Sequence, residues 1–498
     1  MPELLRTLIV ISVLSAATFW VIAKALPDFL TVKEFKRWVT AWFTIVITAF
    51  ISHNIWLFLA ITACFCFVRI AAEPKLRIIY YLVLFCAVPQ YPVEIPGLLG
   101  IRYLFNIDYP RLLIIALLLG PFFKNHSNPR LFALSSDRYI VLFVCLMSYL
   151  SFRDNTFTNA LRESILFFLS IIVPYYTLSR YLSDISQLNR AFIAMFIGLS
   201  PFALVGVFET LRHWHLYNAL AQNLVGSEVG GGYDIRSGGL RASAIFQGPI
   251  VLGYVMVIGF GLLLYLKPLI KNQRMANMMG LTIAACLLAS MARGPWVGFV
   301  SLYLAYIWTG REAVKKTAQW ALVGLVLLPV LSLTSVGDKF IQLLPFIGST
   351  RSDTVDYRSR LFENAWIVFQ RHPWFGSTTF LDTPEMESMR QGEGIIDLVN
   401  TFIQIALPYG VFGLFLFLTI FLGLLFRCYF ILKRIPRDEV NLIRMGRALF
   451  AILSAILTTI TTMSSINYVP TFYWALVGII AAYLNVAEKT IRLNSANR

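Results

Sequence analysis

The feature that most constrains this chain is a series of apolar runs that recurs from end to end. Most runs approach the ~20 residues that a helix needs to cross a bilayer. The runs are continuous rather than alternating in polarity, which excludes a transmembrane β-barrel. They predict an all-α, polytopic helical membrane protein with about 12 to 15 transmembrane helices. The expected spans are 7–25, 38–53, 54–70, 77–90, 110–123, 137–152, 161–180, 189–210, 244–266, 275–291, 294–310, 318–335, 397–426, 447–465 and 469–487.

The composition agrees with this class. Of the 498 residues, 58% are hydrophobic and only 14% are charged, whereas soluble domains carry about 25% charged residues. The formal net charge of +16 could indicate nucleic-acid binding. Most basic residues lie in alternate short loops, however, and this pattern orients membrane proteins. We therefore predict a lipid bilayer, and no nucleic acid, as partner.

The same charge pattern places the N-terminus and the segments 211–243 and 336–396 outside the cytoplasm. We predict one integral membrane domain over residues 1–498, without a separate soluble domain. The run 38–70 can form a tight hairpin or one broken helix. The run 77–123 contains Pro89, Pro92 and Pro96, so it can dip into the bilayer without crossing it. The six cysteines lie in apolar runs without metal-ligand spacing, so we predict neither a metal site nor a cofactor.

The longest polar interruption runs from about Val336 to Gln404. It holds more groups able to bind an anion or move a proton than any other loop. We expect residues 336–396 to form a large external loop with short helices. The membrane helices would hold this loop over a cavity.

Arginines near the external ends of membrane helices are candidate anion ligands. Arg241 occupies the first turn of such a helix, where a guanidinium is costly unless it meets an anion. Arg236 precedes it in a glycine-rich segment, and Arg293 lies at the tip of a tight Gly-Pro turn. A phosphate could bind these side chains with help from the positive helix N-terminus. The alternatives are contact with lipid headgroups for Arg241 and an interfacial position beside a tryptophan for Arg293.

A second group of candidates lies on the amphipathic helix expected from Asp356 onward. Arg358 and Arg360, near its start, can form a fork around a diphosphate, which lysine does less well. Glu363 lies one turn after Arg360, so these two can instead form a surface salt bridge. The apolar face of this helix contains Leu361, Ala365 and Val368.

Acids and a histidine near the end of the large loop are candidate proton carriers. Asp397 enters the bilayer at the start of a long apolar run, where it either accepts a proton from a substrate hydroxyl or pairs with an external arginine. Glu363 is a second candidate acceptor, and Asn400 lies beside Asp397 as a candidate ligand. His372 precedes Pro373, which ends the helix. It therefore acts either as an acid or base, or as a C-terminal cap.

In this order and spacing, these stretches resemble the O-antigen ligase and polymerase superfamily of bacterial envelopes. The resemblance covers roughly residues 230–430. The stretches that carry it are Arg236 to Pro249, Met291-Ala-Arg293-Gly, Tyr357 to Trp366, His372-Pro-Trp-Phe-Gly376, and Ile396 to Gln404 followed by Gly410 and Gly413.

The resemblance implies a fold similar to the multi-helix, GT-C-like glycosyltransferases that use lipid-linked sugars. It implies an inverting, metal-independent reaction on a glycan carried by undecaprenyl diphosphate. The family's essential arginines map to Arg241 and Arg360. Ligases usually have a histidine beside the asparagine that corresponds to Asn400, whereas this chain has Val399 there. The departure favours a polymerase and puts a histidine base in doubt.

The residues and the resemblance together predict a membrane glycosyltransferase that polymerises undecaprenyl-diphosphate-linked repeat units into exopolysaccharide or O-antigen. We expect it in the bacterial inner membrane with its active site facing the periplasm, beside a flippase and a chain-length regulator. The alternatives are an O-antigen ligase acting on lipid A-core or another acceptor, and a transporter or flippase for lipid-linked sugars. The expected catalytic residues are Arg241, Arg360, Asp397 and Glu363, and the expected substrate or diphosphate ligands are Arg236, Arg293, Arg358, His372 and Asn400.

Overall fold

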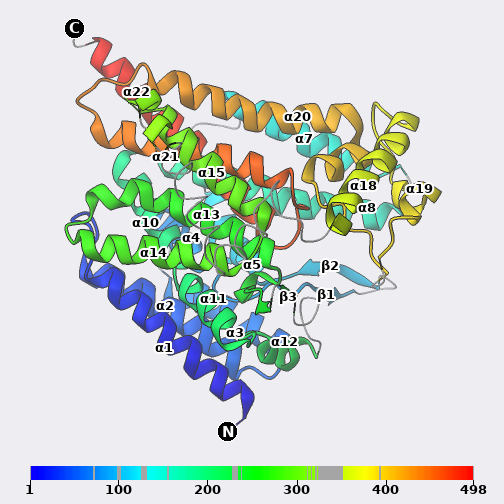
Figure 1. Ribbon diagram of the computed structural model, residues 1–498, viewed down its shortest axis with the longest axis horizontal. Helices are drawn as coiled ribbons and strands as arrows, with labels where there is room; N and C mark the ends of the chain where they lie inside the picture. The colour runs from blue at the N-terminus through cyan, green and yellow to red at the C-terminus, as the bar shows by residue number, and fades with distance from the viewer. Residues whose placement is uncertain are drawn as a thin grey trace.

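A computed structural model describes residues 2–70, 73–97, 102–124, 132–153, 156–226, 234–236, 238–310, 312–315, 317–319, 322, 352–391 and 394–496. Helices make up most of it (Figure 1). Within this part of the chain, seven helices are long and apolar enough to cross a membrane. The polytopic helical class is therefore confirmed. These helices are Glu3–Ala23, Phe157–Tyr181, Ile185–Arg212, Pro249–Leu269, Thr401–Leu432, Val440–Ile460 and Tyr468–Ser495.

Several expected spans form shorter helices, which is why the expected number of spans exceeds these seven. The run 38–70 forms two helices, α2 (Val32–Ile51) and α3 (Ile55–Arg69), and is therefore a tight hairpin rather than one broken helix. The expected span 318–335 lies mostly outside the described residues. The other helices before the polar stretch are α1 (Glu3–Ala23), α4 (Pro74–Leu84), α5 (Tyr109–Leu113), η1 (Ile114–Leu118), α6 (Leu119–Phe123), α7 (Ser135–Leu150), α8 (Phe157–Phe167), η2 (Phe168–Ile172), α9 (Val173–Tyr181), α10 (Ile185–Leu199), α11 (Pro201–Arg212), α12 (Asn218–Val225), η3 (Ala244–Phe246), α13 (Pro249–Leu266), η4 (Lys267–Leu269), α14 (Gln273–Ala289) and α15 (Arg293–Trp308).

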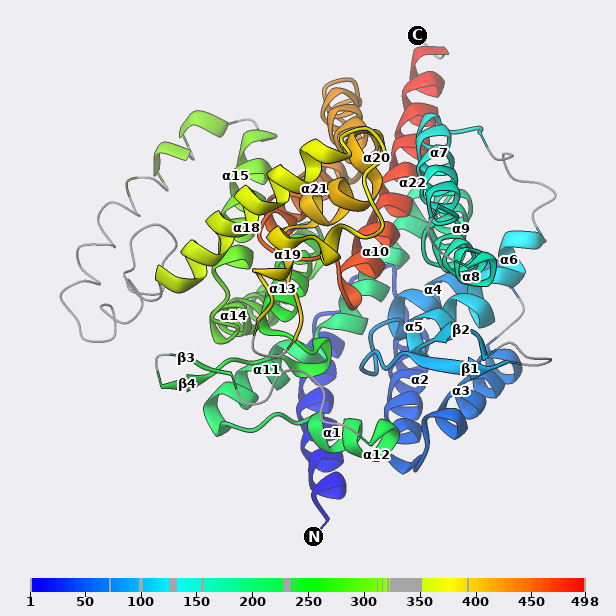
Figure 2. The same ribbon diagram turned by 90° about the vertical axis from the view of Figure 1, so that its right-hand side faces the viewer.

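Two short antiparallel hairpins interrupt the helical pattern. β1 (Val93–Pro96) pairs with β2 (Tyr103–Ile107) in the proline-containing run 77–123, so this run leaves the helical conformation between α4 and α5. β3 (Ile235–Arg236) pairs with β4 (Gly239–Leu240) just before Arg241. Figure 2 looks onto the end of the molecule where both hairpins lie together with α12, α18 and α19. The described parts of the segments 211–243 and 336–396 therefore share one end, as their common assignment to the outside requires.

The packing of α15 against α21 (Val440–Ile460) depends on glycine. A Cβ at Gly298 would lie 2.0 Å from the Thr459 Oγ1, and a Cβ at Gly294 would lie 2.0 Å from the Thr462 Oγ1. Only a residue without a side chain permits this approach. Arg293, the first residue of α15, consequently stands beside the loop that joins α21 to α22 (Tyr468–Ala496).

Helix α18 (Ser352–Arg371) is the amphipathic helix that the sequence predicts, although it begins before Asp356. Its predicted apolar face is buried, whereas Phe362 and Trp366 on the other face are exposed. The short helices η5 (Phe380–Asp382) and α19 (Pro384–Glu387) follow it, as expected for the large loop. The segment from α18 to the start of α20 has a small core of its own, which contains Leu361, Ala365, Val368, Phe380, Met386, Met389, Leu398 and Leu407.

The long helix α20 (Thr401–Leu432) is interrupted at Gly410, and the turn at 372–376 fills the interruption. Gly410 has φ 64° and ψ −163°, a conformation that is used almost only by glycine. The Val411 amide donates to the Pro373 carbonyl at 2.7 Å. A Cβ at Gly410 would lie 2.3 Å from the Trp374 carbonyl oxygen. The turn that ends α18 is therefore joined by its backbone to a membrane helix.

Arg153, from the end of α7, reinforces this junction. Its Nη1 donates to the Gly376 carbonyl and its Nη2 to the Pro408 carbonyl, each at 2.9 Å. Pro408 lies inside α20 and cannot donate a backbone hydrogen bond. The Phe412 amide donates to the Trp374 carbonyl instead of to the Pro408 carbonyl. The guanidinium therefore satisfies the Pro408 carbonyl and ties it to the Gly376 carbonyl of the turn.

Candidate functional site

Three of the predicted arginines lie at the turn between α14 and α15. Arg236 Nη1 donates to the Met291 carbonyl at 3.1 Å, and Arg241 Nε donates to the Ser290 carbonyl at 3.2 Å. Arg293 follows directly on the same turn. The hairpin β3–β4 therefore brings Arg236 and Arg241 to the segment that presents Arg293.

Arg241 is already engaged by a carboxylate. Its Nη1 lies 2.6 Å from the Asp234 Oδ2, and its side chain is only 13% exposed. The Arg241 amide also donates to the Asp234 carbonyl at 3.0 Å. In this state Arg241 holds the α14–α15 turn, and its role as a diphosphate ligand remains a prediction.

A buried glutamate that sequence reasoning missed fixes the segment after Arg241. Glu209, on α11, is fully buried. Its Oε2 accepts hydrogen bonds from the amides of Ser243 at 3.0 Å and Ala244 at 2.9 Å, and its Oε1 accepts one from the Leu216 amide at 3.1 Å. A carboxylate that satisfies three amides pins two loops to one helix.

Replacing Glu209 by glutamine is expected to lower the thermal stability of the detergent-solubilised protein. The side-chain NH2 of the glutamine would then face at least one backbone N–H and leave that donor without an acceptor. An unsatisfied buried donor costs about 1–3 kcal/mol. We expect Tm to fall by several degrees for Glu209→Gln and to stay unchanged for Glu94→Gln, whose side chain is exposed. An unchanged Tm in both variants would contradict the assigned role.

Arg293 and Arg358, which the sequence predicts as separate candidate ligands, meet at the α21–α22 loop. Arg358 Nη2, from α18, donates to the Thr462 carbonyl at 3.2 Å, and Thr462 also abuts Gly294 at the start of α15. Burial around the guanidinium lowers the pKa of Arg358, Asp397 opposes this shift, and Arg293 adds to it. Two guanidiniums and one carboxylate therefore act on one another here.

Asp397 is anchored to the same loop. Its Oδ1 accepts from the Ser464 hydroxyl at 2.8 Å and from the Val399 amide at 3.1 Å. Its backbone carbonyl accepts from the Tyr357 hydroxyl, on α18, at 2.9 Å. A few residues later, Gln404 Oε1 accepts from the Ser465 amide at 2.6 Å. The entry to α20 is thus bound to residues 462–465, which we call the central loop.

Asn400 has a structural role in this arrangement. It is the N-cap of α20, and its Oδ1 accepts from the amides of Phe402 at 2.8 Å and Ile403 at 3.3 Å. These bonds satisfy amides that lack partners at the start of a helix. The sequence signal for this role was an asparagine directly before a long apolar run.

A cavity of about 730 Å³ opens beside Asp397 and the central loop. Its size is typical of small-molecule sites, which span about 300–1,000 Å³. Its lining includes Asp397, Ser464 and Ser465. It also includes Arg111 on α5 and Glu163 on α8, which are far from these three residues in the sequence. Sequence reasoning missed these last two residues because each lies in a run that reads as a membrane span.

Neither Arg358 nor the other candidates on α18 line this cavity, and the Arg358 side chain is exposed. Arg360, Glu363 and His372 are all exposed. Within the described residues, Glu363 forms no ion pair with Arg360, and its Oε1 accepts a long contact of 3.5 Å from the Ser359 hydroxyl instead. His372 follows the last residue of α18, where Pro373 stops the helix as expected. The roles of these three side chains in transfer remain predictions.

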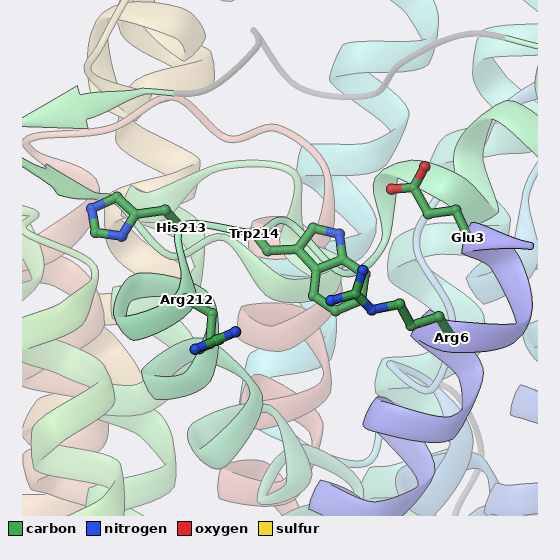
Figure 3. Close-up of a pocket in the computed structure, with 5 residues that line it drawn as sticks. All are labelled: Glu3, Arg6, Arg212, His213 and Trp214. Atoms are coloured by element: carbon green, nitrogen blue, oxygen red, sulfur yellow. The ribbon is translucent and has the colours of Figure 1, made fainter. Parts of the chain in front are cut away.

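A second hollow lies at the N-terminus (Figure 3). It has a volume of about 340 Å³ and is lined by Glu3, Arg6, Arg212, His213 and Trp214. The Arg6 guanidinium stacks over the Trp214 ring at 4.6 Å. None of the predicted site residues lines this hollow. It does place the N-terminus on the same side as the segment 211–243, which agrees with the orientation derived from charge.

The described residues form no cluster that could bind a metal ion, and no curated relative points to a further site. Among the described residues, no three His, Cys, Asp or Glu side chains gather where they could hold a metal ion. No curated protein matches the chain.

The comparison with protein families gives one match. Residues 278–418 match the family model described as O-antigen ligase. The matched region begins in α14, contains α15, α18 and α19, and ends in α20, so it includes Arg293, Arg358 and Asp397 but not Arg241. This match supports a glycosyltransferase-like membrane enzyme. Over residues 278–418 the chain is thus similar to the O-antigen ligase family, which confirms the resemblance to the O-antigen ligase and polymerase superfamily.

Proposed function

We propose that this protein transfers a glycan from a polyprenyl diphosphate to an acceptor hydroxyl at the membrane surface. The observation that carries the proposal is the meeting of Arg293, Arg358 and Asp397 at the central loop. This group lies within the region that matches the O-antigen ligase model, and its Asp397 lines the 730 Å³ cavity. The arginines that support the proposal best are therefore Arg293 and Arg358.

The chemistry of the leaving group explains the need for two guanidiniums. When the bond between the sugar C1 and the diphosphate oxygen breaks, negative charge grows on the diphosphate. Fixed positive groups stabilise that charge most effectively where water is partly excluded. Arg293 and Arg358 come from separate helices, α15 and α18, and both are adjacent to Thr462. They can hold the two phosphates without a metal ion, since arginine binds phosphate oxygens in a fork.

The surface of α18 suits a donor that arrives in the bilayer. Phe362, Trp366 and Phe369 line an apolar hollow of about 200 Å³ together with residues of α20. Trp374 and Phe375, just after α18, are also exposed. Exposed aromatic side chains are typical of the membrane–water interface. An isoprenoid chain held here would deliver its diphosphate beside Arg358, so the lipid supplies orientation and effective concentration.

The acceptor would enter the cavity beside Asp397. We propose that this acceptor is a second lipid-linked repeat unit, so that the reaction is polymerisation, because Val399 stands where ligases usually have a histidine. The donor lipid would be undecaprenyl diphosphate, and the site would face the periplasm from the bacterial inner membrane. Transfer would invert the configuration at C1. A carboxylate would accept the hydroxyl proton.

A reconstituted assay tests this function. Purified protein in liposomes, supplied only with lipid-linked repeat units extracted from the source bacterium, is expected to give a ladder of longer glycans on electrophoresis. A product that appears only after a second acceptor such as lipid A-core is added would identify a ligase. Movement of labelled donor across the bilayer without any new glycosidic bond would contradict the proposal and identify a transporter.

A further inference from the structure

The proposed transfer needs a group that accepts the acceptor's proton, and the cavity contains one that no motif reveals. Glu163 lies on α8, one and a half turns after the helix begins at Phe157. Its carboxylate lines the 730 Å³ cavity and is partly buried. Within the described residues it forms neither a hydrogen bond nor an ion pair. An ionisable side chain within a membrane helix, left without a structural partner, indicates a functional role.

We propose that Glu163 is the proton acceptor of the transfer reaction, which rests on the function proposed above. The acceptor hydroxyl oxygen forms a bond to C1 of the donor sugar. The C1–O bond to the diphosphate breaks, and its electron pair leaves with the diphosphate. The hydroxyl proton passes to the Glu163 carboxylate, which then releases it to water.

The other carboxylate in the cavity is less suited to this step. Asp397 Oδ1 already accepts from the Ser464 hydroxyl and the Val399 amide, so its carboxylate is held against the central loop. Asp397 also acts electrostatically on Arg358. It therefore belongs with the groups that hold the diphosphate site in place. Arg111, the basic residue in the cavity lining, pairs with Asp108 at 2.9 Å. Within the described residues it forms no ion pair with Glu163.

The position of α8 fits a displacement that inverts C1. In such a reaction the acceptor approaches from the side opposite to the leaving group, so the base and the diphosphate ligands must flank the sugar. Figure 2 shows α15 and α18, which carry Arg293 and Arg358, on one side of α22, and α8 on the other. The helix that carries Glu163 thus lies on the opposite side of α22 from the helices that carry the arginines.

The test compares transfer and donor binding in the same proteins. Glu163→Gln is expected to lower kcat for ladder formation by about 100-fold or more, the range of general base catalysis, while binding of undecaprenyl diphosphate stays within twofold of the unaltered protein. Glu163→Asp is expected to recover part of the rate. Ser164→Ala is the matched control, because its hydroxyl bonds only to the Ala160 carbonyl of its own helix at 2.8 Å.

The pH profile separates catalysis from a merely structural effect. The other titratable groups that line the cavity are Arg111, Asp397, Tyr409 and Tyr473. We expect the pH dependence of kcat that the unaltered protein shows to be lost in Glu163→Gln and kept in Ser164→Ala. Full activity in Glu163→Gln, with transfer lost in Asp397→Asn, would overturn the proposal and leave the function standing. Absence of transfer in the unaltered protein would instead overturn the function.

Discussion

Replacing Arg358 by alanine is expected to lower the rate of glycan transfer by about 100-fold to 1,000-fold, the range measured when one donor to a developing oxyanion is removed. The guanidinium bonds to the Thr462 carbonyl and interacts electrostatically with Arg293 and Asp397, so no other described side chain of α18 takes its place. An arginine keeps its charge at neutral pH, and the loss should therefore be independent of pH between 6 and 8. Ladder formation with purified variants in liposomes measures it.

Two variants of the same helix sharpen this result. Arg371→Ala is the control, because Arg371 lies at the exposed end of α18, where it pairs with Glu385. We expect it to retain nearly full activity, as exposed salt bridges contribute about 0–1 kcal/mol. The family resemblance predicts that Arg360→Ala also loses transfer. Full activity in Arg358→Ala together with lost activity in Arg360→Ala would move the diphosphate site from Arg358 to Arg360 and contradict the arrangement proposed here.

Replacing Gly410 by alanine is expected to prevent correct folding, or to lower Tm by ten degrees or more. The backbone conformation there costs a non-glycine residue about 1–3 kcal/mol. The added Cβ would also lie 2.3 Å from both the carbonyl carbon and the carbonyl oxygen of Trp374. These are backbone atoms bonded across the junction, so they cannot move aside as a side chain could. Fluorescence-detected size-exclusion chromatography and a thermal melt report the outcome.

The matched control for this prediction lies in the same helix. A Cβ at Gly423 would meet nothing within 4 Å. Gly423→Ala is therefore expected to leave Tm unchanged or to raise it slightly, because alanine favours a helix interior over glycine by about 1 kcal/mol. If both variants behaved like the unaltered protein, the junction between α20 and the turn at 372–376 would not be as tight as described.

Local patterns predicted much of the fold. The 3.6-residue period of apolar side chains predicted which face of α18 is buried, and Pro373 predicted where this helix ends. The apolar runs gave the membrane class because backbone groups in a bilayer must bond within a helix. The expected number of spans exceeds the seven long apolar helices of the described residues, since a run of apolar residues does not reveal whether its helix continues for the full width of the bilayer.

The site was harder to predict because its parts are far apart in the sequence. Arg293, Arg358 and Asp397 could be named as candidates from the sequence, since each lies in a polar segment next to a membrane helix, and their roles remain predictions. Glu163 and Arg111 were missed because they stand alone in apolar runs, and only tertiary packing brings them to the cavity of Asp397. The central loop was missed as well. Its threonine and serine residues carry no charge, yet their hydroxyl and backbone groups bind Asp397 and Arg358.

The bond between the turn at 372–376 and α20 also determines how Arg358 can move. The far end of α18 is fixed to a membrane helix through the Val411 amide and the Arg153 guanidinium. Arg358 lies about 20 Å along the helix axis from that fixed end, given a rise of 1.5 Å per residue. Any tilt of α18 is therefore a rotation about Pro373, and a rotation of 10° shifts the guanidinium by about 3.5 Å over that length. Opening the contact with Thr462 to admit a phosphate thus requires only a small change of angle in one surface helix, while the bilayer-embedded helices stay where they are.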